Sequence, residues 1–118
     1  MSMRPPTGPK GEETAAQYLK KKGYKIIERN FRTPFGEIDI IAEDGRTVVF
    51  VEVKTRLTNS RGAPSEAVNW RKRNKIEKCA LYYSTIRRPD AALRFDVIGI
   101  DAGRVEHIKD AFEAQSQR

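Results

Sequence analysis

The sequence predicts an α/β fold in which a mixed sheet carries helices on both faces. Three observations favour this class. Helix-like and strand-like stretches follow one another as helix, three strands, helix and one or two strands. Residues 48–51 form a continuous apolar run, typical of a central strand covered on both sides. The Asp44 and Gly45 step between two apolar runs is a strong signal for a tight hairpin.

The first expected elements are a helix over residues 11–22, ended by Gly23, and a strand over residues 24–31. Glu12 precedes two alanines of the helix's apolar stripe by three and four residues, so it falls on that stripe. Glu12 is therefore either a carboxylate directed towards the core or an ordinary acid stabilised by the helix dipole. The stripe consists of Ala15, Ala16 and Leu19.

The hairpin over residues 36–56 organises the chain. If the loop pairs Glu43 with Arg46, Glu37 lies directly opposite Glu52. Asp39 and Lys54 then share the same face, so three carboxylates and one ammonium collect at the open end of the hairpin. Such a cluster requires a cation, a shared proton or a nearby lysine. Mg²⁺ suits two or three carboxylates plus water, and the alternative is a surface hairpin with a solvated acidic edge.

The segment after the hairpin, residues 57–64, is rich in turn formers and is expected to be a loop, either a clamp on a phosphate backbone or a plain connector. A second helix is expected from Ser65 or Asn69 to about residue 86. Lys72 precedes the apolar Ile76 by four residues and so lies on the core-facing side. Trp70 at the helix start either stacks on a base or covers the core, and core packing is favoured.

Two strands close the domain, over residues 93–100 and 104–108. Asp96 is expected to be a hydrogen-bonded structural acid, with a supporting role near the carboxylates as the alternative. His107 has no metal-binding partner at useful spacing and is interpreted as structural. Cys79 lies on the apolar stripe of the second helix and is interpreted as a small buried hydrophobe.

A chain of 118 residues fits one domain, expected over residues 11–112 between flexible tails at 1–10 and 113–118. No stretch approaches the length of a membrane span, and no apolar signal-peptide core begins the chain, so a cytoplasmic location is expected. One cysteine and one histidine exclude an internal disulfide and a structural zinc site.

The net charge of +7 is unevenly distributed. Residues 37–52 carry five acids and one arginine, whereas residues 70–88 carry seven basic residues and one acid. An acidic pocket among basic flanks is typical of proteins that bind polyanions, of which nucleic acid is the commonest. A solvated helix face is the alternative interpretation of the basic run.

Five blocks of this sequence form a pattern, namely Gly11-Glu12 with Ala15, Gly36-Glu37-Ile38-Asp39, Val51-Glu52-Val53-Lys54 with Arg56, Lys72, and Arg94-Phe95-Asp96-Val97. In order and spacing, these blocks resemble the YraN family, also called UPF0102, whose small bacterial members are placed in the restriction-endonuclease-like, or PD-(D/E)XK, superfamily. The similarity covers roughly residues 11–112. The superfamily's namesake proline is replaced here by Ile38, a departure common in the superfamily that leaves the chemistry possible.

The resemblance implies a restriction-endonuclease-like core and an Mg²⁺- or Mn²⁺-dependent endonuclease acting on DNA, with branched or structured DNA as candidate substrates. It makes Asp39 and Glu52 metal ligands, Lys54 the lysine of the motif and Glu12 the acid of the first helix, and these four are the expected catalytic residues. The hairpin register adds Glu37 as a third metal ligand or as an acid that holds a water beside the metal. Basic residues expected to hold the nucleic acid are Arg56, Arg61, Arg71, Lys72, Arg73 and Lys75.

Other functions remain open on the sequence. The main alternative is a non-catalytic nucleic-acid-binding module on a nuclease fold, because a fold does not determine an activity. A protein-interaction domain that retains an acidic pocket is a further alternative. A homodimer is plausible, since nucleases of this fold that cut two strands often act as dimers.

Overall fold

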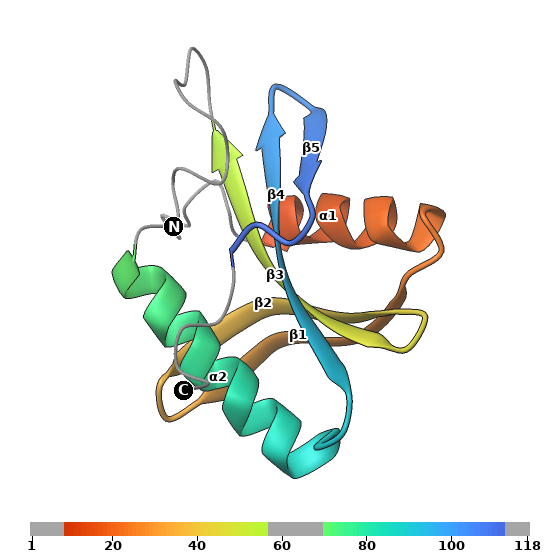
Figure 1. The fold of residues 1–118 in the computed structure, drawn as a ribbon. Helices are drawn as coiled ribbons and strands as arrows, with labels where there is room; N and C mark the ends of the chain where they lie inside the picture. The colour runs from red at the N-terminus through yellow and green to blue at the C-terminus, as the bar shows by residue number, and fades with distance from the viewer. Residues whose placement is uncertain (1–8, 57–69, 113–118) are drawn as a thin grey trace.

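The computed structural model describes residues 9–56 and 70–112, which form one five-stranded sheet and two helices (Figure 1). The expected loop at residues 57–64 and most of both expected tails lie outside the described residues. The elements, in chain order, are α1 (Pro9–Lys21), β1 (Lys25–Thr33), β2 (Gly36–Asp44), β3 (Thr47–Arg56), α2 (Trp70–Arg87), β4 (Ala92–Asp101) and β5 (Arg104–Ile108).

The sheet has the order β1-β2-β3-β4-β5 and is mixed. β3 and β4 pair in parallel, and every other neighbouring pair is antiparallel. Parallel pairing of consecutive strands requires a crossover, and the connection that contains α2 supplies it. The continuous apolar run thus forms the central strand, as predicted. This α/β architecture is compatible with a restriction-endonuclease-like core.

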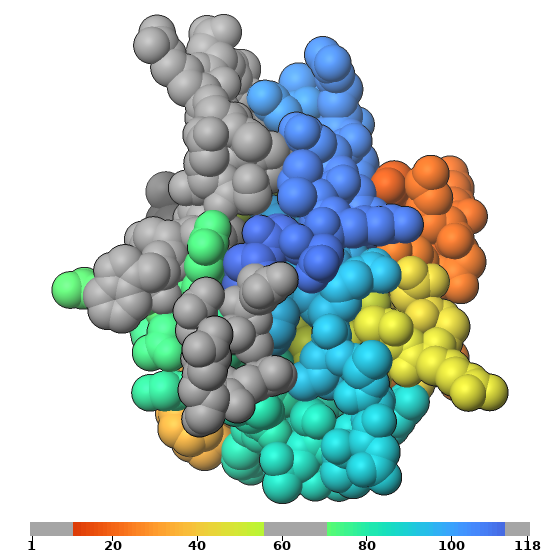
Figure 2. Space-filling view, in the orientation of Figure 1, coloured from red at the N-terminus to blue at the C-terminus, as the bar shows by residue number. Residues whose placement is uncertain are grey.

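Each helix covers one face of the sheet (Figure 1). On the α1 face, the core contains Leu19 of the helix and Val49, Val51 and Val53 of β3. On the α2 face, side chains of the helix pack against β2, β3 and β4. These residues include Ile76, Cys79, Ala80, Tyr83, Ile41, Phe50 and Phe95. Figure 2 shows the two helices on separate surfaces, with the tip of the β2–β3 hairpin projecting beyond the body of the molecule.

The predicted register of the β2–β3 hairpin is wrong. Asp44 pairs with Thr47, and Ile41 pairs with Phe50, so the two-residue loop is Gly45 and Arg46. Gly45 has a φ of +63°, which its missing Cβ permits. The loop therefore begins at the glycine rather than at the aspartate. Every residue of β3 lies two positions away from its predicted partner, and a shift of two keeps each side chain on its face.

The corrected register removes the proposed opposition of Glu37 and Glu52. Glu37 lies at the outer end of β2, where its partner is Arg32 of β1, and its side chain is exposed. The β2–β3 ladder ends at Ile40 and Val51, so Gly36, Glu37 and Ile38 pair with β1 alone. The geometric argument for Glu37 as a metal ligand therefore no longer holds.

Candidate active site

Asp39 occupies the point at which β2 leaves β3. Ile38 belongs to the core on the α2 face and Ile40 to the core on the α1 face, so the regular alternation of side chains breaks between them. Just beyond the end of the ladder, Oδ2 of Asp39 accepts a hydrogen bond of 2.8 Å from the backbone N–H of Val53. This bond fixes the carboxylate against β3 at the position where the two strands separate.

The environment of Asp39 strongly disfavours its charged form. Burial raises the pKa of Asp39 to about 8, with the negative charge of Glu52 as the next largest cause. The hydrogen bond from Val53 lowers this pKa, Glu12 raises it and Lys72 lowers it. Charges from both helices therefore converge on one carboxylate, because Glu12 lies on α1 and Lys72 on α2.

Glu52 and Lys72 form an ion pair across the α2 face of the sheet. Nζ of Lys72 lies 2.7 Å from Oε2 of Glu52, and the Glu52 side chain is only 10% exposed. Burial acts to lower the pKa of Lys72, but its hydrogen bond to Glu52 and the carboxylate charge together raise that pKa above its ordinary value. The predicted inward orientation of Lys72 is thus confirmed, and the residue contacts the carboxylate site.

Lys54 follows Glu52 by two residues on the same face of β3 and is half-buried. Burial lowers the pKa of the Lys54 ammonium, and the charge of Lys72 and a hydrogen bond with Lys72 lower it further. The carboxylates of Glu52 and Asp39 oppose this shift. Two lysines and two carboxylates therefore share one small region at the edge of the β2–β3 ladder.

Glu12 lies in the first turn of α1, and it is buried. Its neighbour Glu13 is exposed and accepts hydrogen bonds from Gln17 and Arg29, both at 2.7 Å. The pattern of the helix thus separates an inner from an outer glutamate, as its spacing predicts. Since Glu12 also acts on the pKa of Asp39, it belongs to the same electrostatic site.

The described residues of the site offer a hard divalent cation two carboxylates. Asp39 and Glu52 supply two carboxylates, and the raised pKa of Asp39 indicates that the positive charge provided by lysine does not fully compensate the pair. Within residues 9–56 and 70–112, however, no three histidine, cysteine or acidic side chains are grouped so that they could hold a metal ion together. The residues therefore fit a cation held by two carboxylates and completed by water or substrate oxygens.

The predicted nucleic-acid contacts separate into four groups. Arg71 and Lys75 are exposed on α2 and are available to a backbone phosphate. The guanidinium of Arg73 lies 5.2 Å from the ring centroid of Phe112, so part of its role is packing. Lys72 contacts Glu52. Arg61 and the side chains of Arg56 and Trp70 lie outside the described part of the structure.

Sequence reasoning missed the extent of the network around Asp96. This carboxylate is buried and accepts hydrogen bonds from Nε and an Nη of Arg94, at 2.9 and 2.8 Å, and from the backbone of Asp110. Nε2 of His107 lies 2.7 Å from Asp96. Asp96 and His107 are structural in this geometry, as expected. Arg94 also reaches Asp44 and the Tyr24 hydroxyl, links that no short-range spacing signals.

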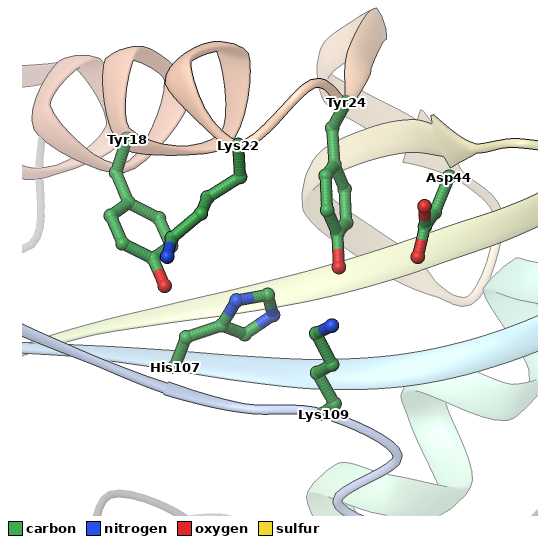
Figure 3. Close-up of a pocket in the computed structure, with 6 residues that line it drawn as sticks. All are labelled: Tyr18, Lys22, Tyr24, Asp44, His107 and Lys109. Carbon is green, nitrogen blue, oxygen red and sulfur yellow. The ribbon is translucent and has the colours of Figure 1, made fainter.

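A pocket of about 440 Å³ lies beside this network (Figure 3). Tyr18, Lys22 and Tyr24 extend into it from α1 and the segment that follows, and His107 and Lys109 line its opposite side. Both tyrosine rings meet the His107 ring edge-on, with centroids 5.5 and 5.8 Å apart. This pocket lies towards the C-terminal end of α1, whereas Glu12 lies in its first turn.

Neither described helix is both long enough and apolar enough to cross a membrane.

Comparison with known proteins gives a consistent family assignment. The model of the "Uncharacterised protein family UPF0102" matches residues 11–100. A UPF0102 protein of Thermodesulfovibrio yellowstonii is 52% identical over 105 residues, covering 89% of this chain and 94% of the relative. A relative from Geobacter sulfurreducens is 51% identical, with 90% and 88% covered, and one from Syntrophus aciditrophicus is 49% identical, with 91% and 88% covered. The chain therefore belongs to the UPF0102 family.

Proposed function

We propose that this protein is a metal-dependent endonuclease that hydrolyses phosphodiester bonds of DNA, with Mg²⁺ or Mn²⁺ as its cofactor. One observation carries the proposal. Two acidic side chains, Asp39 and Glu52, meet beside Lys54 at the end of a β-ladder. Carboxylates that can hold a cation, next to a lysine that faces the same space, form one set of groups that can catalyse phosphodiester hydrolysis.

Asp39 and Glu52 would hold the metal ion. When bound, the ion would lower the pKa of a coordinated water and neutralise charge on the phosphate. The hydrogen bond from Val53 keeps the Asp39 carboxylate in a fixed orientation, so little reorganisation is needed on binding. Lys72 holds the Glu52 carboxylate in place through their 2.7 Å ion pair.

Lys54 would donate a hydrogen bond to a non-bridging oxygen of the scissile phosphate, where negative charge develops in the transition state. Its lowered pKa also favours release of a proton to the departing oxygen. Glu12 would accept a hydrogen bond from the attacking water on the α1 side of Asp39. Arg71 and Lys75 would hold neighbouring phosphates of the strand, and the proposal places this activity in the cytoplasm.

A cleavage assay tests the proposal. Labelled duplex, single-stranded and four-way branched DNA are each incubated with purified protein and 10 mM MgCl₂ or MnCl₂, or with EDTA. Cleavage is expected with metal only, and Glu52→Gln and Asp39→Asn should both abolish it. The exposed Glu106→Gln variant is a matched control that should cleave like the wild type. Equal cleavage by wild type and Glu52→Gln would contradict the proposal.

A non-catalytic nucleic-acid-binding module is the second candidate. The observation that favours it is the Lys72–Glu52 ion pair, which gives a carboxylate of the site a protein cation in place of a metal. In that case DNA affinity would be the same with and without Mg²⁺, and none of the three DNA forms would be cleaved. The same assay, read together with a binding titration, separates the two candidates.

A further inference from the structure

Large apolar side chains are exposed at one place on the described surface. Phe35, Leu81, Tyr82 and Ile86 are between 36% and 55% exposed, and all four lie on the outer side of α2 or in the β1–β2 turn beside it. Together with Lys78 and Thr85 they line a groove of about 450 Å³. We name this groove the aromatic groove. In Figure 1, α2 and the β1–β2 turn lie side by side at this edge of the molecule.

The two aromatic rings of the groove are held in place. Phe35 and Tyr82 meet at a ring-centroid distance of 6.5 Å and an interplanar angle of 74°. The backbone N–H of Phe35 donates to Oγ1 of Thr33 at 2.9 Å, and the same oxygen lies 3.1 Å from Sγ of Cys79 on α2. The turn is therefore attached to the helix, and the exposed rings form a preformed surface that binds at little conformational cost.

The rim of the groove is positively charged. Nζ of Lys78 lies 5.9 Å from the centroid of Phe35, and Lys75 is exposed one turn earlier on α2. Residues 70–88 carry seven basic residues and one acid. A second copy of this chain would bring two such rims together, and like charges repel. The charge therefore favours an anionic occupant, and exposed aromatic rings beside lysines suit the stacked bases and phosphates of a single nucleic-acid strand.

The groove begins close to the candidate active site. Lys78 follows Lys72 by six residues on α2, a separation of about 9 Å along the helix axis. Phe35 precedes Asp39 by four residues, or about 13 Å of extended chain. Stacked nucleotides advance roughly 3.4 Å each, so a few nucleotides span the distance between the two places.

We propose that unpaired bases of a single-stranded nucleic acid stack on Phe35 and Tyr82, with Lys75 and Lys78 contacting the adjacent phosphates. This inference rests on the proposed nuclease function for its biological meaning. It narrows the substrate class to nucleic acid with a single-stranded segment within a few nucleotides of the cleaved bond. DNA and RNA both carry flat aromatic bases and phosphates, and the test compares a strand of each.

The test measures binding in EDTA, so that it does not depend on cleavage. Fluorescence anisotropy follows labelled 20-nucleotide oligothymidine, the matching oligouridine and a 20-base-pair DNA duplex. Phe35→Leu keeps apolar bulk but removes the ring, and Tyr82→Ala removes the second ring. Each should lower single-strand affinity about tenfold, the scale of one stacked base, and duplex affinity by less than twofold. Tyr82→Phe should bind like the wild type.

Gln17→Ala is the control, because Gln17 is an exposed, uncharged residue of α1, on the other face of the sheet from the groove. It should change single-strand affinity less than twofold. Wild-type affinity in both Phe35→Leu and Tyr82→Ala would overturn the inference. The inference would also be overturned if sedimentation showed that the wild type is a dimer and that either variant is a monomer, because the groove would then be a contact between two copies of the chain. Loss of binding to phosphatidylglycerol vesicles with unchanged oligonucleotide affinity would overturn it in favour of a lipid surface.

Failure of this inference and failure of the proposed function give different results. If the wild type cleaves DNA with Mg²⁺ but the aromatic variants bind and cleave normally, the inference fails and the nuclease proposal stands. If the aromatic variants lose single-strand affinity but the wild type cleaves nothing, the groove is a binding surface and the nuclease proposal fails.

Discussion

Nζ of Lys72 lies 2.7 Å from Oε2 of Glu52, so an ammonium on α2 contacts one of the two carboxylates proposed to hold a metal. Within residues 9–56 and 70–112, no ion pair of this kind is formed by the second carboxylate, Asp39, and its pKa is raised to about 8 by burial first and by Glu52 second. The Lys72 ammonium therefore compensates only part of the negative charge of the two carboxylates. A divalent cation and the Lys72 ammonium are therefore expected to stabilise the same carboxylates.

Replacing Lys72 with methionine should make the fold more dependent on metal. The variant leaves Glu52 buried without its ammonium, and loss of a partly buried ion pair costs about 1–3 kcal/mol of unfolding free energy, discounted here for the exposed part of Lys72. Thermal unfolding should show a lower Tm in EDTA. Addition of 10 mM MgCl₂ should raise the Tm of Lys72→Met more than that of the wild type.

Lys75→Met is the control for this experiment, since Lys75 is exposed on the same helix. It should unfold like the wild type with and without MgCl₂. An equal Mg²⁺ effect on the wild type, Lys72→Met and Glu52→Gln would show that the cation does not bind at these carboxylates.

Lys54→Ala should remain folded and bind metal almost normally while losing catalytic rate. Lys54 is half-buried and faces the same side of β3 as Glu52, so its removal leaves both carboxylates in place. Loss of one transition-state donor lowers kcat by about 10²-fold or more. Glu52→Gln should instead lose metal affinity and rate together. Single-turnover cleavage and isothermal titration with MnCl₂ measure the two effects separately.

If Lys54→Ala, prepared free of host nucleases, cleaves at the wild-type rate, the Lys54 ammonium has no catalytic role and serves only as a counter-charge for the carboxylates. Lys54→Arg offers a further control, because it keeps the charge but changes the donor geometry. Partial recovery of rate in that variant is expected if the charge of Lys54 acts on the phosphate.

The faces of the strands could be predicted from the sequence, but the pairing register could not. Alternation alone places Phe50, Glu52 and Lys54 on one face, and this holds for any register that differs by two residues. The register depends on which two residues form the loop. The sequence signal marks Asp44 and Gly45, whereas Asp44 pairs with Thr47 and makes an ion pair with Arg94 across the sheet. A long-range contact of this kind leaves no local pattern.

In the carboxylate site, too, the sequence predicts which way a side chain points but not which strands or helices it meets. Spacing predicts that Glu12 and Lys72 point inwards, because each depends only on the period of its own helix. It cannot predict that Asp39 lies between two core clusters, since this depends on where β2 leaves β3. Glu37 was placed in the site by the register alone, and the structure puts it opposite Arg32 instead.

Arg71 and Lys75 should account for part of the salt dependence of nucleic-acid binding. Both are exposed on α2, and each phosphate contact contributes about one unit to the slope of log affinity against log salt concentration. Arg71→Ala and Lys75→Ala should each lower the slope by about one. Arg73→Ala should change it less, because Arg73 also packs on Phe112. Affinity that does not vary between 50 and 200 mM NaCl would contradict an electrostatic interface.

The Asp96 network should give the protein a defined acid sensitivity. Burial raises the pKa of Asp96 and is the largest single influence, but hydrogen bonds from His107, Arg94 and the backbone of Asp110 together hold that pKa below its ordinary value. A carboxyl whose folded-state pKa is depressed stabilises the fold above its unfolded-state pKa, near 4 on the usual scale. That contribution is lost as the pH falls towards the folded-state pKa.

Asp96→Asn removes this contribution and tests its size. The variant leaves the partly buried Arg94 without its main carboxylate, which should cost about 3–5 kcal/mol at pH 7. Urea unfolding of the wild type should show stability falling as the pH drops below about 4, and this component of the fall should be absent in Asp96→Asn. The exposed Asp90→Asn variant is the matched control and should follow the wild-type profile. If Asp96→Asn and the wild type lose stability in parallel below pH 4, the Asp96 carboxylate does not contribute to the pH dependence of unfolding. The acid sensitivity then arises from other carboxylates.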